Sequence, residues 1–98
     1  MRLTLAFVAA ATLALATPAH AQSVPDWSIA KECAGDITCP RFERFARDQV
    51  AGIWETLPPD VRSTCIAETE QVERSYRLLY DCLANKMQER LRLGWRQR

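Results

Sequence analysis

Four cysteines in a short chain constrain the possible folds more than any other feature of this sequence. The chain has 98 residues, and Cys65 and Cys82 stand 17 positions apart in its second half. In one continuous helix these two residues would lie about 25 Å apart, far beyond the span of a disulfide. If they are bonded to each other, the chain must fold back between them.

Four cysteines allow three pairings, and their spacing favours the local one. Cys33 and Cys39 would close the short loop 34–38, where Gly35 supplies a bendable backbone. Cys65 and Cys82 would lock two antiparallel helices together. Each bond would contribute about 2–3 kcal/mol to the stability of the domain. The two other pairings, which would tie the N-terminal loop to later helices, stay open.

A structural role for the cysteines is favoured over redox or metal chemistry. A thiol oxidoreductase would use a Cys-x-x-Cys pair, and no two cysteines of this chain have that spacing. Zinc would need ligands close together in sequence, and the single histidine, His20, falls in a segment that we expect to be removed. We therefore predict two disulfides, no metal and no cofactor.

The first 21 residues have the pattern of a secretory signal peptide. Arg2 gives a positive start, residues 3–16 are almost entirely apolar, and Ala19 and Ala21 are small residues placed for cleavage after Ala21. The apolar run is shorter than the roughly 20 residues of a membrane-spanning helix. We predict a periplasmic or secreted mature chain without a transmembrane helix. The alternative interpretation of residues 3–16 is an ordinary buried helix.

Helical spacing of apolar residues organises the rest of the chain after an N-terminal arm and disulfide loop at 22–39. Trp27 is expected to anchor the arm by packing. Pro58 and Pro59 separate the first helix from the second. The predicted fold is all-α: a small three-helix bundle, or a helical hairpin plus one helix, stapled by two disulfides. Its helical domain spans 40–93, and a basic tail spans 94–98.

The expected core lies on one apolar stripe of each helix. The first stripe consists of Phe42, Phe45, Ala46, Val50, Ile53, Trp54 and Leu57. The opposite face, with ion pairs Glu43–Arg47 and Arg44–Asp48, is expected to be hydrated. The second stripe consists of Val61, Cys65, Ile66 and Thr69. The third consists of Tyr76, Leu79, Tyr80, Leu83, Met87 and Leu91, with the tyrosine hydroxyls reaching water.

The position of the last turn depends on the cysteines rather than on turn residues. No glycine or proline interrupts residues 68–74, so periodicity alone would allow one long helix. Pairing of Cys65 with Cys82 places the midpoint between Glu73 and Arg74. The next residue, Ser75, is a plausible N-cap. A helical hairpin with its turn near residues 73–75 is therefore predicted.

Charge and composition exclude several functional classes. After the predicted cleavage, basic and acidic residues balance at 12 each, so bulk binding of nucleic acid is not expected. The mature chain would have no histidine, and none of its serines lies in a nucleophile motif. No catalytic constellation is visible, and we expect a protein that is not an enzyme.

A resemblance rests on residues from Trp54 onward. They are Trp54, Leu57, Pro58, Arg62, Cys65, Ser75, Tyr76, Leu79, Cys82 and Leu83. This pattern resembles a group of small, largely uncharacterised exported helical proteins common in alphaproteobacteria, and the resemblance implies a periplasmic helical fold and no activity. The chain departs from the group in lacking Gly or Pro before Ser75 and in its longer basic extension. A fainter likeness is to helical periplasmic lysozyme inhibitors.

The last helix carries the candidate functional surface. The residues proposed for it are Lys86, Arg90, Arg92, Trp95, Arg96 and Arg98. An apolar stripe beside these cations could bind an acidic exported protein or lie on an anionic membrane. The alternative is simple core packing with hydrated arginines. We therefore expect a non-catalytic exported interaction or envelope-associated protein, with an inhibitor or chaperone of another periplasmic protein, such as a lysozyme-type hydrolase, as the alternative.

Overall fold

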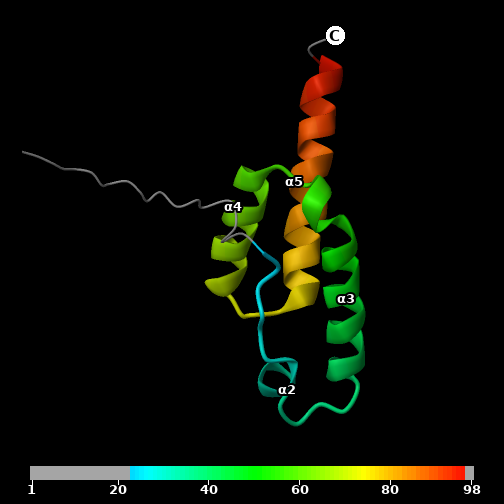
Figure 1. Cartoon of the computed structure of the whole chain (residues 1–98), viewed down its shortest axis with the longest axis vertical. Helices are drawn as coiled ribbons and strands as arrows, with labels where there is room; N and C mark the ends of the chain where they lie inside the picture. The colour runs from blue at the N-terminus through cyan, green and yellow to red at the C-terminus, as the bar shows by residue number, and fades with distance from the viewer. Residues whose placement is uncertain (1–22, 97–98) are drawn as a thin grey trace, which may run out of the picture.

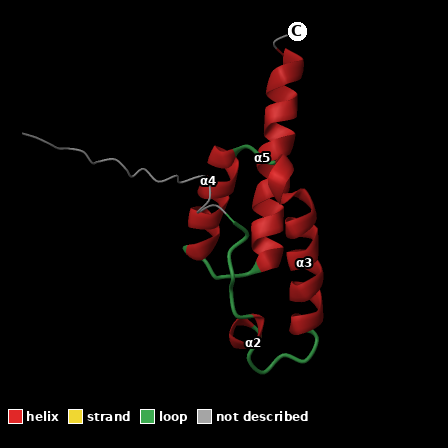
Figure 2. Ribbon diagram, in the orientation of Figure 1, coloured by secondary structure: helices red, strands yellow, loops and turns green. Residues whose placement is uncertain are grey.

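The computed structural model describes residues 23–96, which contain four α-helices and no strand (Figure 1). They are α2 (Ile29–Glu32), α3 (Cys39–Ile53), α4 (Pro59–Glu70) and α5 (Tyr76–Arg96), and a 3-10 turn, η2 (Trp54–Thr56), follows α3. Loops join them (Figure 2). The predicted all-α fold with two disulfides is confirmed. The predicted signal peptide, with its cleavage after Ala21, lies outside the described residues.

The long helix α5 organises the bundle. Helices α3 and α4 each pack along α5 and contact each other far less (Figure 1). The side chains of Val50, Trp54, Cys65, Leu79 and Leu83 are fully buried where the three helices meet. These residues belong to the apolar stripes predicted for the three helices, so the inner part of the predicted core is confirmed.

Two disulfides staple the bundle in the favoured pairing. Cys33 and Cys39 are bonded with their Cα atoms 5.4 Å apart, and Cys65 and Cys82 are bonded with their Cα atoms 5.6 Å apart. Gly35 in the first loop has a φ of 84°, a left-handed conformation that costs glycine little. The second bond joins α4 to α5 across the hairpin, and residues 71–75 form the turn predicted from it.

The N-terminal arm is held by Trp27 and Tyr76. Their rings lie 5.3 Å apart between centroids, and both side chains are buried. The backbone N–H of Trp27 donates to the Tyr76 hydroxyl at 2.8 Å, and that hydroxyl donates to the carbonyl of Pro25 at 2.7 Å. The predicted packing role of Trp27 is confirmed. The prediction that the Tyr76 hydroxyl reaches water was wrong, because the arm covers it.

The predicted orientation of α3 was wrong at its N-terminal end. Phe42 and Phe45 were expected in the core but are 53% and 63% exposed, whereas Glu43 was expected in water and is only 3% exposed. A helix turns about 100° per residue, which places Glu43 within about 20° of Val50 and Phe45 about 140° away from it. The two predicted ion pairs, Glu43–Arg47 and Arg44–Asp48, do not occur among the described residues.

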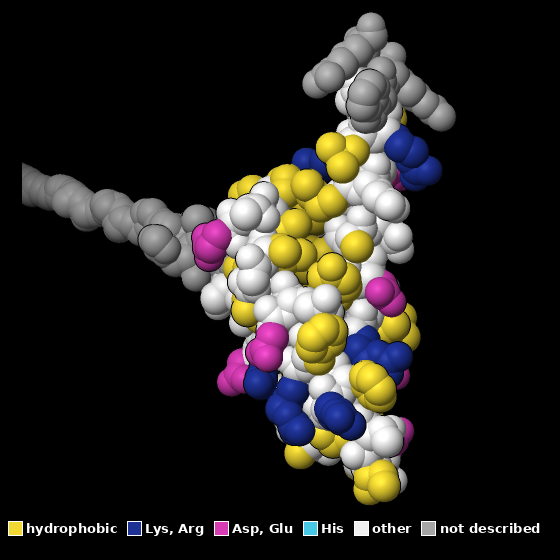
Figure 3. All heavy atoms as spheres, turned by 90° about the vertical axis from the view of Figure 1, so that its right-hand side faces the viewer, with side chains coloured by type: hydrophobic (Ala, Val, Ile, Leu, Met, Phe, Trp, Pro, Cys, Tyr) yellow, Lys and Arg dark blue, Asp and Glu magenta, His cyan; other side chains and the backbone are white. Residues whose placement is uncertain are grey.

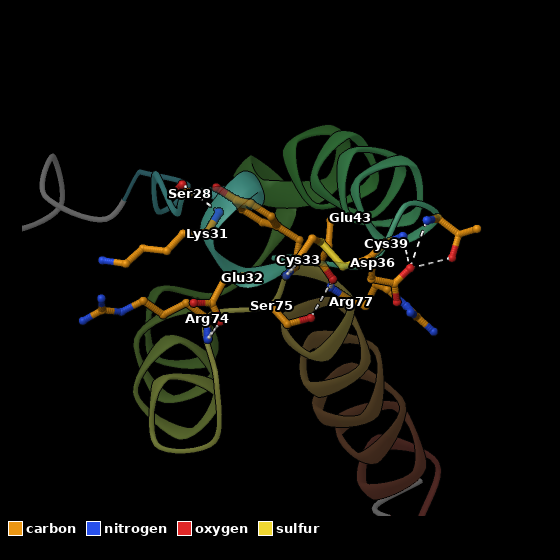
Figure 4. The surroundings of a disulfide bond; sticks show 12 residues. Ser28, Lys31, Glu32, Cys33, Asp36, Cys39, Glu43, Arg74, Ser75 and Arg77 are labelled. Atoms are coloured by element: carbon orange, nitrogen blue, oxygen red, sulfur yellow. Dashed lines mark hydrogen bonds between the residues drawn. A yellow bond between two sulfur atoms is a disulfide. The ribbon is translucent and has the colours of Figure 1, made fainter.

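The buried Glu43 caps the start of α5. One carboxylate oxygen accepts the backbone N–H of Tyr76 at 2.7 Å, and the other accepts the Ser75 hydroxyl at 2.7 Å (Figure 4). Ser75 in turn accepts the N–H of Leu78 at 3.3 Å, so the predicted N-cap is confirmed. The first turn of α5 has no acidic residue of its own, and a carboxylate there is stabilised by the helix dipole. Glu43 thereby fixes how α5 sits on α3.

Candidate functional site

The last turns of α5 project beyond the bundle. Helix α5 continues through Gly94 to Arg96, past the point where the basic tail was expected to begin, and it extends well beyond the ends of α3 and α4 (Figure 1). Every residue from Gln88 to Gly94 is exposed. We call residues 88–96 the α5 overhang. The side chains of Trp95 and Arg96, and all of Arg98, lie outside the described part of the structure.

The apolar stripe of α5 continues into the overhang but turns away from the core. Leu83, Met87 and Leu91 follow one another at steps of four, and each step turns by about 40°, so Leu91 lies about 80° around the helix from Leu83. Leu83 is 0% exposed, Met87 is half-buried and Leu91 is 64% exposed. Hydrophobic side chains gather at the base of the projecting helix (Figure 3). The prediction that Leu91 packs in the core was wrong, because neither α3 nor α4 is long enough to cover it.

A second apolar side chain, Leu93, lies on the flank of the overhang that faces α4. It lines a groove of about 240 Å³ with Asp60, Val61, Thr64, Lys86, Glu89 and Arg90. Leu93 itself is exposed. The overhang therefore presents leucine side chains on two flanks, and one of them borders a groove floored by α4.

Two of the predicted surface cations form ion pairs with carboxylates of the bundle itself. Lys86 forms an ion pair with Glu68 at 3.5 Å, and Arg90 forms one with Asp60. Arg92 borders a groove of about 380 Å³ that Glu68 also lines, and it makes no ion pair with any described residue. The acidic residues of α4 thus neutralise much of the positive charge that the sequence alone assigned to this surface.

A different exposed surface was missed by the sequence analysis. Phe42 and Phe45 line a groove of about 220 Å³ between α3 and α5, together with Ala46, Gln49, Arg77, Tyr80 and Asp81. The Arg77 guanidinium lies 5.6 Å from the centroid of the Phe42 ring, within range of a cation–π contact. The angular distance of Phe45 from Val50 was the signal that could have revealed this surface.

Asp36 organises the loop next to this surface. The pKa of Asp36 is lowered because the backbone N–H of Thr38, the Thr38 hydroxyl and the N–H of Cys39 all donate to its carboxylate, at 2.9, 3.0 and 3.2 Å. The positive charge of Arg77 adds to the effect. These contacts serve the local turn and the start of α3.

Free thiols and clusters of metal ligands are absent from the described residues. All four cysteines are disulfide-bonded, and no group of three or more potential metal ligands occurs in residues 23–96. None of the described helices combines the length and the apolar character that crossing a membrane requires.

Comparisons with known proteins give no relative: no family model, no curated protein and no solved structure matches the chain. The resemblance to exported helical proteins therefore stays a prediction.

Proposed function

We propose that this chain is a non-catalytic exported protein that binds another exported protein through the α5 overhang. The observation that carries the proposal is the pair of exposed leucines on the projecting turns of α5, Leu91 and Leu93, which lie about 80° to either side of the direction of the fully buried Leu83. Single exposed leucines are common on protein surfaces. Two exposed leucines on turns that project beyond the bundle are a different feature, because a partner can pack against both of them.

Rigidity supports the overhang as a binding element. The Cys65–Cys82 bond and the Glu43 contacts hold the earlier turns of α5. A partner would therefore bind a helix whose first half is already ordered, which lowers the entropic cost of association. Burying the exposed parts of Leu91 and Leu93 would contribute about 1–2 kcal/mol each.

Charge favours a protein partner over a lipid surface at this site. Lys86 and Arg90 are already paired with carboxylates of α4, which leaves less net charge to attract an anionic membrane. An amphipathic helix of a partner, packing on Leu91 with an acidic residue opposite Arg92, fits the described groups.

Export is the other part of the proposal. It is supported by the signal-like pattern of residues 1–21 and by the two disulfides, which are typical of proteins in oxidising compartments. A fusion of residues 1–30 to a periplasm-dependent reporter tests this part separately, and a reporter that stays inactive and uncleaved would contradict it.

The binding surface can be tested by comparing three immobilised proteins. The oxidised mature chain, its Leu91→Asp variant and its Val72→Asp variant are attached through the N-terminal arm and incubated with an extract of the cell envelope. Val72 is an exposed apolar residue in the turn after α4, far from the overhang, and so provides a matched control. We expect a defined protein to be retained by the wild type and by Val72→Asp, and about ten-fold less by Leu91→Asp.

Circular dichroism and mass mapping of the disulfides must first show that both variants are folded. Equal retention by the wild type and Leu91→Asp would contradict the proposal, because the charged side chain would then sit in the binding surface without effect. A loss of retention that is equally large in Val72→Asp would also contradict the proposal.

A further inference from the structure

Three large apolar side chains are exposed at the end of the molecule that holds the Cys33–Cys39 loop. Ile37, in that loop, is 95% exposed, and Phe42 and Phe45 follow in the first two turns of α3. Single exposed apolar side chains are common on protein surfaces, but three large ones close together call for an explanation. Figure 3, which faces the α3 side, shows hydrophobic side chains next to Lys or Arg side chains in its lower half.

Arginines are interleaved with these apolar residues. Arg41 and Arg44 alternate with the phenylalanines along α3, and both are exposed and make no ion pair with any described residue. Arg77 lies over the Phe42 ring. We call this set, with Ile37 and Phe45, the phenylalanine–arginine face.

On this face three arginines, Arg41, Arg44 and Arg77, stand against two carboxylates. The carboxylates are Asp36, which interacts with Arg77, and Asp81, which lines the same groove as the two phenylalanines and Arg77. Asp48 lies one turn after Arg44 on α3. The net positive charge of the face comes from Arg41 and Arg44, which make no ion pair with any described residue. They differ in this respect from Lys86 and Arg90, which are paired with α4.

The chemistry of this face matches the boundary of an anionic membrane. Aromatic rings and aliphatic side chains can enter the region between headgroups and acyl chains, while long arginine side chains beside them reach the phosphates. The stacked Arg77 and Phe42 would place a guanidinium at the level of the phosphates when the ring is inserted. Each arginine near an anionic surface strengthens binding about five-fold.

The two exposed surfaces lie at opposite ends of α5. Arg77 and Leu91 are 14 positions apart in one helix, which corresponds to about 21 Å along its axis. The two surfaces could therefore be used at the same time.

We propose that the phenylalanine–arginine face binds peripherally to anionic membrane surfaces. This inference does not depend on the proposed protein partner of the overhang, since a different set of residues carries each of them. The test is sedimentation of the oxidised mature chain with vesicles of phosphatidylglycerol and phosphatidylcholine at about 3:7, with pure phosphatidylcholine vesicles in parallel. We expect binding to the mixed vesicles, much weaker binding to the neutral ones, and loss of binding as salt rises from about 0.05 M to about 0.5 M.

Variants then locate the surface. The double variant Phe42→Ser, Phe45→Ser and the double variant Arg41→Gln, Arg44→Gln should each weaken binding to the mixed vesicles about 25-fold, since every substitution removes about five-fold. All four side chains are exposed, so the fold should persist, and circular dichroism checks it. The matched control is Leu91→Ser, which removes an equally exposed apolar side chain at the opposite end and should leave binding unchanged.

Two results would overturn the inference. One is a wild-type chain that does not bind the mixed vesicles even at low salt. The other is binding that Leu91→Ser abolishes and the phenylalanine variants retain, which would move the membrane contact to the overhang. A loss in the Phe42→Ser, Phe45→Ser variant with Leu91→Ser unaffected supports the inference whatever partner the overhang proves to have.

Discussion

Replacing Glu43 with alanine should destabilise the bundle more than any other change of a charged residue on α3. The side chain is 3% exposed, and its two oxygens accept hydrogen bonds from the Ser75 hydroxyl and the Tyr76 N–H, both at 2.7 Å. Removing the carboxylate would leave two buried donors without a partner, and each would cost about 1–3 kcal/mol. The desolvation cost of the carboxylate is recovered at the same time. The net loss should be about 3 kcal/mol.

Urea denaturation of the oxidised protein measures this loss directly. Asp48→Ala is the matched control, because Asp48 is an exposed carboxylate on the same helix, and its removal should change the free energy of unfolding by less than about 0.5 kcal/mol. Glu43→Gln keeps one acceptor oxygen and should lose about half as much as Glu43→Ala. In a double-mutant cycle with Ser75→Ala, the two losses should not add, because both substitutions remove the same bond. A Glu43→Ala protein as stable as the control would refute the capping role.

Two further predictions concern the disulfides and the loss of stability at low pH. Converting Cys65 and Cys82 to serine should cost about 3 kcal/mol and converting Cys33 and Cys39 about 2 kcal/mol, because the first bond closes a loop of 17 residues and the second a loop of 6; thermal unfolding of each double variant gives the order, and the reverse order would contradict it. Because the folded-state pKa of Asp36 is lowered, its contribution to stability is present above its unfolded pKa and is lost as the pH falls through the folded pKa. Asp36→Asn should therefore flatten the decrease in stability on the acid side, and an unchanged profile would show that the turn does not depend on this carboxylate.

Periodicity and cysteine spacing were sufficient to predict the architecture. The repeat of apolar residues every three or four positions identified the three long helices, because only one face of each meets the others. Cys65 and Cys82 predicted the hairpin in a stretch without glycine or proline, since a disulfide cannot span a straight helix between them. These inferences succeeded because they depend on geometry that is local to the chain or imposed by a covalent bond.

The details of the surfaces could not be predicted in the same way. A stripe drawn through Phe42 and Phe45 was too wide, and hydrophobicity alone could not show that the neighbouring Glu43 takes the buried position. That position depends on the unsatisfied N–H groups of α5, which come from a distant part of the sequence. Similarly, the exposure of Leu91 depends on where α3 and α4 end relative to α5, a property of the assembled bundle.

The most direct test of the α5 overhang as a binding surface is site-specific photocrosslinking in intact cells. Leu91→p-benzoylphenylalanine places a crosslinker on the projecting turns of α5, and the same substitution at Val72 provides the control. If the overhang is the binding surface, irradiation should give a discrete crosslinked product at position 91 that is absent at position 72. No product at position 91, or the same products at both positions, would contradict it.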